Sequence, residues 1–153
     1  MKIESMRLQN FKTFRNIHIK ELPAFLVVVG ANGSGKSTLF DVFGFLHDCL
    51  KNNVRQALDK RGRFREVLSR DCNPQKDKIL IELQYRMKIS NIDRLVTYSL
   101  EIGEVSGQPV VHHEVLRYKR GRYGSPYHFL DFSKGEGYAI TNEEDFNKAD
   151  EEL

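Results

Sequence analysis

The sequence has little cysteine and no long hydrophobic run. Cys49 and Cys72 are the only cysteines among 153 residues, which excludes a disulfide scaffold and favours a reducing, cytoplasmic compartment. A membrane-spanning helix needs about 20 consecutive apolar residues, and the longest apolar run here covers only residues 24–29. The first residues include the acidic Glu4 and no apolar stretch, so we expect no secretory signal peptide.

The chain also lacks a strong charge of either sign. Lys plus Arg number 24 and Asp plus Glu number 21, which gives a net charge of +3. Such a balance argues against a protein that coats nucleic acid over its whole surface, although local basic patches stay possible. Hydrophobic residues make up 40% and charged residues 29%, as in globular proteins. At about 150 residues per domain, the length corresponds to one domain or a piece of one.

Three apolar patterns near the N-terminus predict strands. Apolar and polar residues alternate over residues 2–9 and again over residues 17–20, which is typical of half-buried strands. Residues 24–29 read Ala-Phe-Leu-Val-Val-Val, without any polar position. This run predicts a central strand of a sheet that is covered on both faces.

A helix is predicted directly after a glycine-rich stretch. From Lys36 to Leu50 the apolar residues recur at spacings of three and four and widen into a stripe almost all round the helix. We therefore expect this helix to be buried and packed by more than one neighbour. Gly44 in its middle costs roughly 1 kcal/mol relative to Ala, so we expect it to permit a close approach.

Residues 51–70, from Lys51 to Arg70, form a basic segment. The segment holds seven basic residues and two acids, a local excess of +5. A spacing of four between Val54 and Leu58 suggests a helix with its positive face outward. Such clusters contact phosphates, and Phe64 could stack on a base, so the segment is a candidate DNA surface. The alternative is a solvated helix face.

The second half of the chain predicts antiparallel strands. Alternating segments over residues 79–85, 95–100, 110–118 and 127–132 are separated by glycine-containing turns, which is typical of a β-meander. The last twelve residues, 142–153, hold six acids and one Lys. We therefore divide the chain into a strand–loop–helix core (1–50), a basic helical or loop segment (51–77), an antiparallel β-subdomain (78–141) and an acidic tail (142–153).

The glycine-rich stretch matches the phosphate-binding pattern G-x-x-x-x-G-K-[ST]. It follows an apolar run and opens a helix, so its amides and the helix N-terminus can surround an anion. Lys36 would neutralise the β- and γ-phosphates, Ser37 would bind Mg²⁺ and Thr38 would reach the α-phosphate of ATP. The alternative is a glycine turn that Ser34 caps. The matching residues are Gly30, Ala31, Asn32, Gly33, Ser34, Gly35, Lys36 and Ser37.

These residues give the chain a resemblance to known ATPases. With residues 8–14 (Leu-Gln-Asn-Phe-Lys-Thr-Phe) before it, the loop resembles that of the SMC/RecF/RecN group of ABC-type ATPases, most closely the OLD-like bacterial "AAA family" ATPases. The resemblance implies that residues 30–38 are a Walker A motif and that Lys12 touches the nucleotide phosphates. It implies an α/β P-loop NTPase fold with a mixed sheet and an antiparallel β-subdomain. A solvated turn lysine is the alternative for Lys12.

Several parts that the resemblance requires are missing from the sequence. There is no Walker B strand ending in Asp-Glu, no Leu-Ser-Gly-Gly-type signature, no D-loop and no switch His. Residues 105–108 (Val-Ser-Gly-Gln) read as a hairpin turn and residues 129–131 (Phe-Leu-Asp) as a poor substitute for Walker B. We therefore expect an N-terminal half-domain without turnover of its own, whose acidic tail begins an insertion. Its own C-terminal half and a homodimer would complete the ATPase.

Other candidate ligands and functions carry less weight. Gln84 lies downstream, roughly where a second Mg²⁺ contact could arise, or is simply a polar residue on an exposed strand face. His112 and His113 are adjacent on a strand and point to opposite faces, so they cannot chelate one ion. A small P-loop kinase and a non-catalytic nucleotide-binding module are the alternative functions. Kinases of that type alternate strands and helices after the loop, which the predicted β-meander does not.

Overall fold

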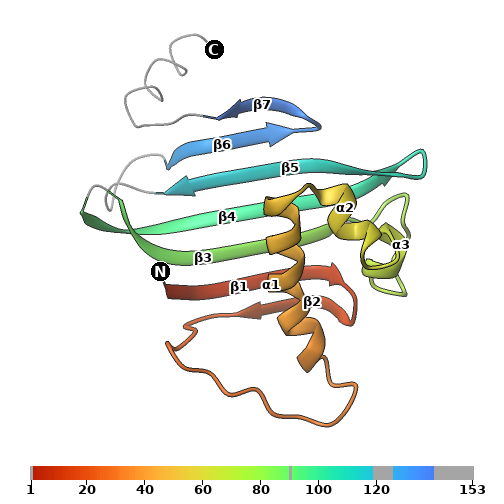
Figure 1. The fold of residues 1–153 in the computed structure, drawn as a ribbon, viewed down its shortest axis with the longest axis horizontal. Coiled ribbons are helices and arrows are strands. Elements are labelled where there is room, and N and C mark those ends of the chain that lie inside the picture. The colour runs from red at the N-terminus through yellow and green to blue at the C-terminus, as the bar shows by residue number, and fades with distance from the viewer. Residues whose placement is uncertain (1, 90, 119–125, 140–153) are drawn as a thin grey trace.

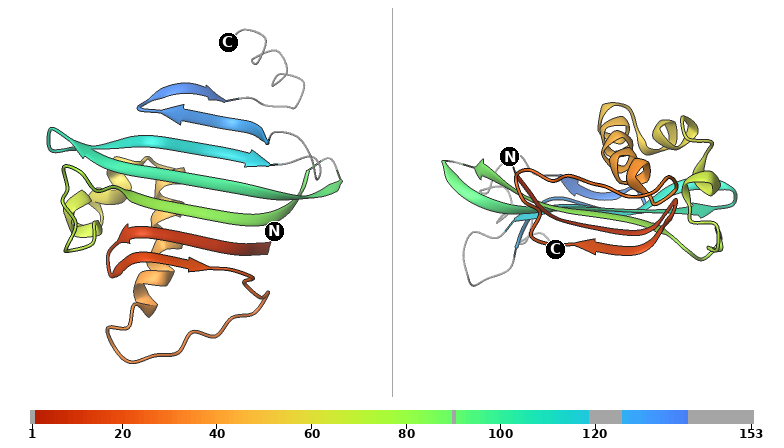
Figure 2. Two further views of the ribbon diagram at one scale, coloured as in Figure 1. Left: turned by 180° about the vertical axis from the view of Figure 1, so that it is seen from behind. Right: turned by 90° about the horizontal axis from the view of Figure 1, so that it is seen from below.

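A computed structural model of the chain describes residues 2–89, 91–118 and 126–139. The described part is one antiparallel sheet with three helices on one of its faces (Figures 1 and 2). The strands are β1 (Lys2–Phe11), β2 (Phe14–Ile19), β3 (Ile79–Ile89), β4 (Ile92–Val105), β5 (Gln108–Tyr118), β6 (Tyr127–Ser133) and β7 (Glu136–Ala139). The helices are α1 (Lys36–Lys51), α2 (Val54–Asp59) and α3 (Phe64–Val67).

The seven strands follow the order β2-β1-β3-β4-β5-β6-β7, and each pair of neighbours is antiparallel. Two-residue loops make two of the hairpins. Ser106 and Gly107 join β4 to β5 with φ of 51° and 75°, and Lys134 and Gly135 join β6 to β7 with φ of 53° and 87°. Positive φ at both positions matches the right-handed strand twist. The predicted meander and the hairpin turn at Val105–Gln108 are thus confirmed over the described residues.

The core lies between the sheet and the inner face of α1. Alternate residues of β1 and β3, such as Leu8 and Ile81, are fully buried, and α1 contributes Val42 and Phe45 from one side. The period of two on the strands and the spacing of three and four on the helix bring these faces together. Burying each such side chain contributes about 1.5–3 kcal/mol. This packing confirms the predicted helix from Lys36 onwards and the strands over residues 2–9 and 79–85.

The α3 segment is tied to the far end of β1. The Lys12 amide donates to the Val67 carbonyl at 2.7 Å, and the Ser69 amide donates to the Asn10 carbonyl at 3.1 Å. A β-bridge joins Phe11 to Leu68. These contacts fix the turn between β1 and β2, which lies beside the start of α1.

The prediction of a central strand over residues 24–29 is wrong for this structure. The segment bends at Ala24 and Phe25 and forms no strand, and only Val28 packs against the core. Phe25 is 81% exposed and Val29 is 84% exposed. The composition favours a strand, but a strand also needs a neighbour for its amides and carbonyls. No described residues supply one, so the sheet is antiparallel rather than mixed.

The prediction that α1 is buried on all sides is also corrected. Its outer face leaves Phe40, Phe43 and Leu50 exposed, because the sheet covers only one side of the helix. The expected close approach at Gly44 is present. A Cβ there would lie 3.3 Å from the Arg61 guanidinium, so the glycine makes room for Arg61.

None of the three described helices is long and apolar enough to cross a membrane. The predicted acidic tail, residues 142–153, lies outside the described residues.

Candidate nucleotide-binding site

The glycine-rich loop forms a pocket at the start of α1. The pocket has a volume of about 350 Å³. Gly33 and Gly35 have φ of 82° and 92°, a conformation that side chains with a Cβ rarely adopt. The lining residues are Thr13, Asn32, Gly33, Gly35, Lys36, Ser37 and Thr38. The fold therefore brings most of the predicted phosphate-binding residues around one hollow.

The N-terminus of α1 has no side-chain cap. Gly35 is the N-cap residue, no side chain bonds to the free amides from that position, and the first turn contains no acid. The first amides of a helix have no partner within the helix, and they carry the positive end of its dipole. The alternative of a turn capped by Ser34 thus finds no support. The Ser34 amide itself donates to the Ala31 carbonyl at 3.2 Å and is unavailable to a ligand.

The Lys36 side chain folds back over the loop. Its ammonium lies 2.5 Å from the Gly30 carbonyl oxygen and 2.6 Å from that of Ala31. Both contacts are exposed to solvent, so a phosphate could replace the two carbonyls as the partner of the charge. Free helix amides, one ammonium and two hydroxyls are the donor set that a magnesium-bound polyphosphate requires. The residues present therefore fit ATP and Mg²⁺.

The sequence matches the family model of the AAA ATPase domain over residues 1–152. The chain belongs to the AAA ATPase domain family. This membership places the protein among the P-loop NTPases and supports nucleotide binding and ATPase activity in general terms. A search of the curated proteins finds no match.

Lys12 does not line the pocket of this ATPase domain. Its ammonium lies 2.5 Å from Asp41 Oδ2, one turn into α1, and Asp41 Oδ1 accepts a hydrogen bond from Arg61 at 3.1 Å. Partial burial raises the pKa of Asp41, but the hydrogen bonds from Lys12 and Arg61 outweigh it and hold that pKa below its usual range. Contact between Lys12 and a nucleotide stays a prediction.

Thr13 was not predicted as a site residue, yet it lines the pocket. Its hydroxyl donates to the Thr38 hydroxyl at 3.3 Å. The stretch that carries the resemblance, residues 8–14, includes Thr13, but the resemblance assigned a role there only to Lys12, and Thr13 and Thr38 are 25 positions apart in the chain. Only the packing of the β1–β2 turn against α1 brings them together.

The two predicted magnesium ligands lie in different places. Ser37 lines the phosphate pocket. Gln84 pairs with Thr97 on β3 and β4, in the register that alternates with the core residues Leu83 and Ile81, so it lies on the face of the sheet that α1 does not cover. Its Oε1 accepts a hydrogen bond from the Ser5 hydroxyl at 3.0 Å. The structure therefore does not bring Gln84 to the loop.

Much of the charge in the basic segment is neutralised within the fold. Lys60 and Arg61 both pair with Asp48 at 2.7 Å, and Arg65 pairs with Glu104 at 2.8 Å. Phe64 is 2% exposed, so it is a core residue and cannot stack on a base as proposed from the sequence. DNA binding by this segment stays a prediction, with a smaller free positive surface than the sequence suggests.

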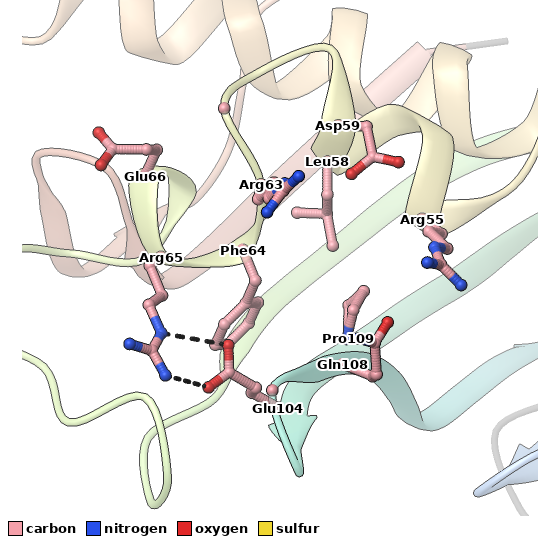
Figure 3. Close-up of a pocket in the computed structure, with 12 residues that line it drawn as sticks. Arg55, Leu58, Asp59, Arg63, Phe64, Arg65, Glu66, Glu104, Gln108 and Pro109 are labelled. Atoms are coloured by element: carbon pink, nitrogen blue, oxygen red, sulfur yellow. Dashed lines mark hydrogen bonds and ion pairs between the residues drawn. The ribbon is translucent and has the colours of Figure 1, made fainter.

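A larger hollow than the loop pocket lies between the α2–α3 segment and the β4–β5 hairpin (Figure 3). Its volume is about 690 Å³. Three arginines and three acids line it, and Arg65 already forms two hydrogen bonds with Glu104. This balance of charge does not favour a polyanion. The charged lining residues are Arg55, Arg63, Arg65, Asp59, Glu66 and Glu104.

The histidines form no metal centre within the described part of the chain. No group of three His, Cys, Asp or Glu residues there could hold an ion. His113 Nε2 and His128 Nδ1 instead lie 3.0 and 2.8 Å from the two oxygens of Asp131. Asp131 therefore belongs to a hydrogen-bond cluster with two histidines on antiparallel strands.

Proposed function

We propose that this domain binds ATP together with Mg²⁺ in the loop pocket and forms the N-terminal part of an SMC/RecF-like, OLD-related ATPase. The observation that carries this proposal is the meeting of an uncapped helix N-terminus with Lys36, Ser37 and Thr38 in one pocket. Family membership supports the ATPase class, whereas the SMC/RecF-like subgroup is supported by the sequence resemblance.

Each residue of the loop has a separate task in the proposed complex. The amides at the start of α1 donate hydrogen bonds to the phosphate oxygens, and Lys36 leaves the Gly30 and Ala31 carbonyls to contact the β- and γ-phosphates. Ser37 offers a hydroxyl ligand to the magnesium ion, and Thr38 contacts the α-phosphate. Mg²⁺ supplies neutralisation of the phosphate charge.

An exposed apolar surface is evidence for a second half of the ATPase that would cover it. We call the side chains of residues 25–29 together with Phe40, Phe43 and Leu50 the outer apolar surface. Its members are between 36% and 84% exposed, apart from the half-buried Val28. Exposed large apolar side chains, when they gather on one surface, mark interaction sites in soluble proteins. We propose that strands carrying the missing Asp-Glu and signature motifs cover it, and that two completed heads pair around ATP.

The small-kinase alternative receives less support than the ATPase. The chain after α1 continues through two short helices into five antiparallel strands, β3 to β7, and not into alternating strands and helices. The hollow between the α2–α3 segment and the β4–β5 hairpin shares no lining residue with the loop pocket, so it does not offer a phosphate acceptor a place beside the loop.

The proposal is tested by titrating the purified chain with Mg-ATP and Mg-ADP in a calorimeter. Lys36→Ala is expected to weaken binding by at least about tenfold, because a charge-assisted contact is worth about 1.5–3 kcal/mol. Lys88→Ala, the same substitution at an exposed lysine of β3, is the matched control and leaves binding unchanged. Absence of binding by the unaltered chain, or equal binding by the Lys36 variant, refutes the proposal and favours a non-catalytic role.

Two further measurements test the idea of a half-domain. The unaltered chain is expected to hydrolyse ATP no faster than Lys36→Ala, because the residues that would activate water are missing from the sequence. Amide exchange over residues 24–29 is expected to be fast in this chain and slow when a chain with the remaining half is used. Turnover above the Lys36→Ala level contradicts the half-domain.

A further inference from the structure

Thr13 occupies the side of the phosphate pocket that faces the helix start. Its hydroxyl oxygen lies 3.3 Å from that of Thr38, and both side chains line the hollow. The distance is long for a hydroxyl pair, for which about 2.7–2.8 Å is usual.

The residues on both sides of Thr13 make contacts with other parts of the fold. On one side, the Lys12 amide donates to the Val67 carbonyl at 2.7 Å and the Ser69 hydroxyl donates to the Phe14 carbonyl at 3.2 Å. On the other side, the Phe14 ring lies so close to Gly35 that a Cβ there would be 3.0 Å from it. The contacts of its two neighbours, Lys12 and Phe14, therefore fix the position of Thr13 beside the start of α1.

The contact determines how the Thr38 hydroxyl can be used. A threonine hydroxyl has one proton to donate and two lone pairs to accept. When Thr13 donates to Thr38, one Thr38 lone pair is occupied and the Thr38 proton is left to point at another acceptor. The acceptor that the proposed complex offers is an oxygen of the α-phosphate.

We infer that Thr13 is a positioning residue of the nucleotide site, which orients the Thr38 hydroxyl as a donor to the α-phosphate. The inference rests on the proposed function, because it needs a nucleotide in the pocket. It adds to the Walker A residues a group from a separate element, the β1–β2 turn. The contact is with the α-phosphate, so ADP and ATP gain equally from it.

The test is a set of binding titrations with Mg-ATP and Mg-ADP. Thr13→Val keeps the shape and removes the hydroxyl, and it is expected to raise both dissociation constants by the same factor, about 2- to 10-fold, the net worth of one hydrogen bond. Thr13→Ser restores the hydroxyl and is expected to bind within about twofold of the unaltered chain. Thr38→Val is expected to weaken binding as well.

The double variant decides whether Thr13 acts through Thr38. Thr13→Val combined with Thr38→Val is expected to bind no more weakly than Thr38→Val alone, since the two hydroxyls form one chain. Thr13 is exposed, so its variants are expected to unfold at the same urea concentration as the unaltered chain.

The possible failures separate the two proposals. If the unaltered chain binds but Thr13→Val binds equally well, or Thr13→Ser loses as much as Thr13→Val, the role of Thr13 is refuted and ATP binding stands. If the unaltered chain does not bind, both proposals fall together.

Discussion

The two faces of α1 differ in burial although both are apolar. The inner face is packed on the sheet, and Val42 and Phe45 are completely buried there. The outer face and the preceding segment leave Phe40 and Phe25 at 64% and 81% exposure, although their composition is equally apolar. The inner face packs against the sheet of the same chain, whereas the outer apolar surface, apart from Val28, is not packed against the core of the described residues. The difference teaches that only the inner face of α1 belongs to the hydrophobic core of the described residues, whereas its outer face is open to a partner.

The same contrast applies to main-chain hydrogen bonds. In the sheet, β1 and β3 to β6 each pair with a neighbour on both sides, and the edge strands β2 and β7 each pair with one. The loop at residues 30–35 has few main-chain hydrogen bonds. The carbonyls of Gly30 and Ala31 accept hydrogen bonds from the Lys36 side chain and not from a neighbouring strand. The amides at the start of α1 are open to a ligand, whereas the amides and carbonyls of the paired strands hold the sheet together.

The largest expected effect on stability comes from comparing the same substitution, phenylalanine to alanine, at a buried and at an exposed position. Phe45→Ala removes a side chain that is 0% exposed and should lower the free energy of unfolding by about 3–5 kcal/mol. Phe25→Ala removes one that is 81% exposed and should change it by less than about 0.5 kcal/mol. Urea unfolding of both variants measures the difference. Similar losses would mean that residues 24–29 are packed within this chain.

A smaller effect is expected from the charges that join α1 to the segment that follows α2. Arg61 bonds to Asp41 and Asp48 and lies over the Phe45 ring at 5.4 Å. Arg61→Met should lower the free energy of unfolding by about 1–3 kcal/mol, because two carboxylates lose a charged donor.

The matched control for Arg61 is Arg55→Met on α2. Arg55 is exposed and has no ion pair within the described ranges, so its loss should cost less than about 0.5 kcal/mol. If the two variants unfold at the same urea concentration, the charge network does not hold α2 against α1.

Backbone strain at the loop gives the next effect. Gly35→Ala requires an alanine at φ of 92°, which costs about 1–2 kcal/mol, and it also crowds the Phe14 ring. Gly107→Ala requires φ of 75° but has open space around it. Gly35→Ala should therefore be the less stable of the two and should also lose Mg-ATP affinity, as thermal unfolding and calorimetry would reveal. Retained affinity in Gly35→Ala would remove the loop geometry from the proposed site.

The smallest effect concerns acid. Hydrogen bonds from Lys60 and Arg61 lower the pKa of Asp48 from 3.8 to about 2. A carboxyl whose folded-state pKa is lowered stabilises the fold above its unfolded pKa, and this contribution is lost as the pH falls from about 4 to about 2. Asp48→Asn should make the urea midpoint less dependent on pH in that window, with Asp59→Asn as the control. An unchanged profile would show that the Asp48 pairs add nothing in solution.

The sequence by itself determined the local elements and the phosphate-binding loop. Alternation predicted β1 and the meander, spacing predicted α1, and the motif from Gly30 to Ser37 predicted the pocket, because each depends on residues close together in the chain. It also predicted a strand over residues 24–29, where composition alone was not enough.

Only the tertiary structure decided which residues far apart in the chain meet. It paired Lys12 with Asp41, brought Thr13 to Thr38, buried Phe64, and moved Gln84 to the uncovered face of the sheet. The physical reason is that exposure and ion pairing depend on neighbours that packing supplies, whereas a local pattern records only what a segment could do once those neighbours are present.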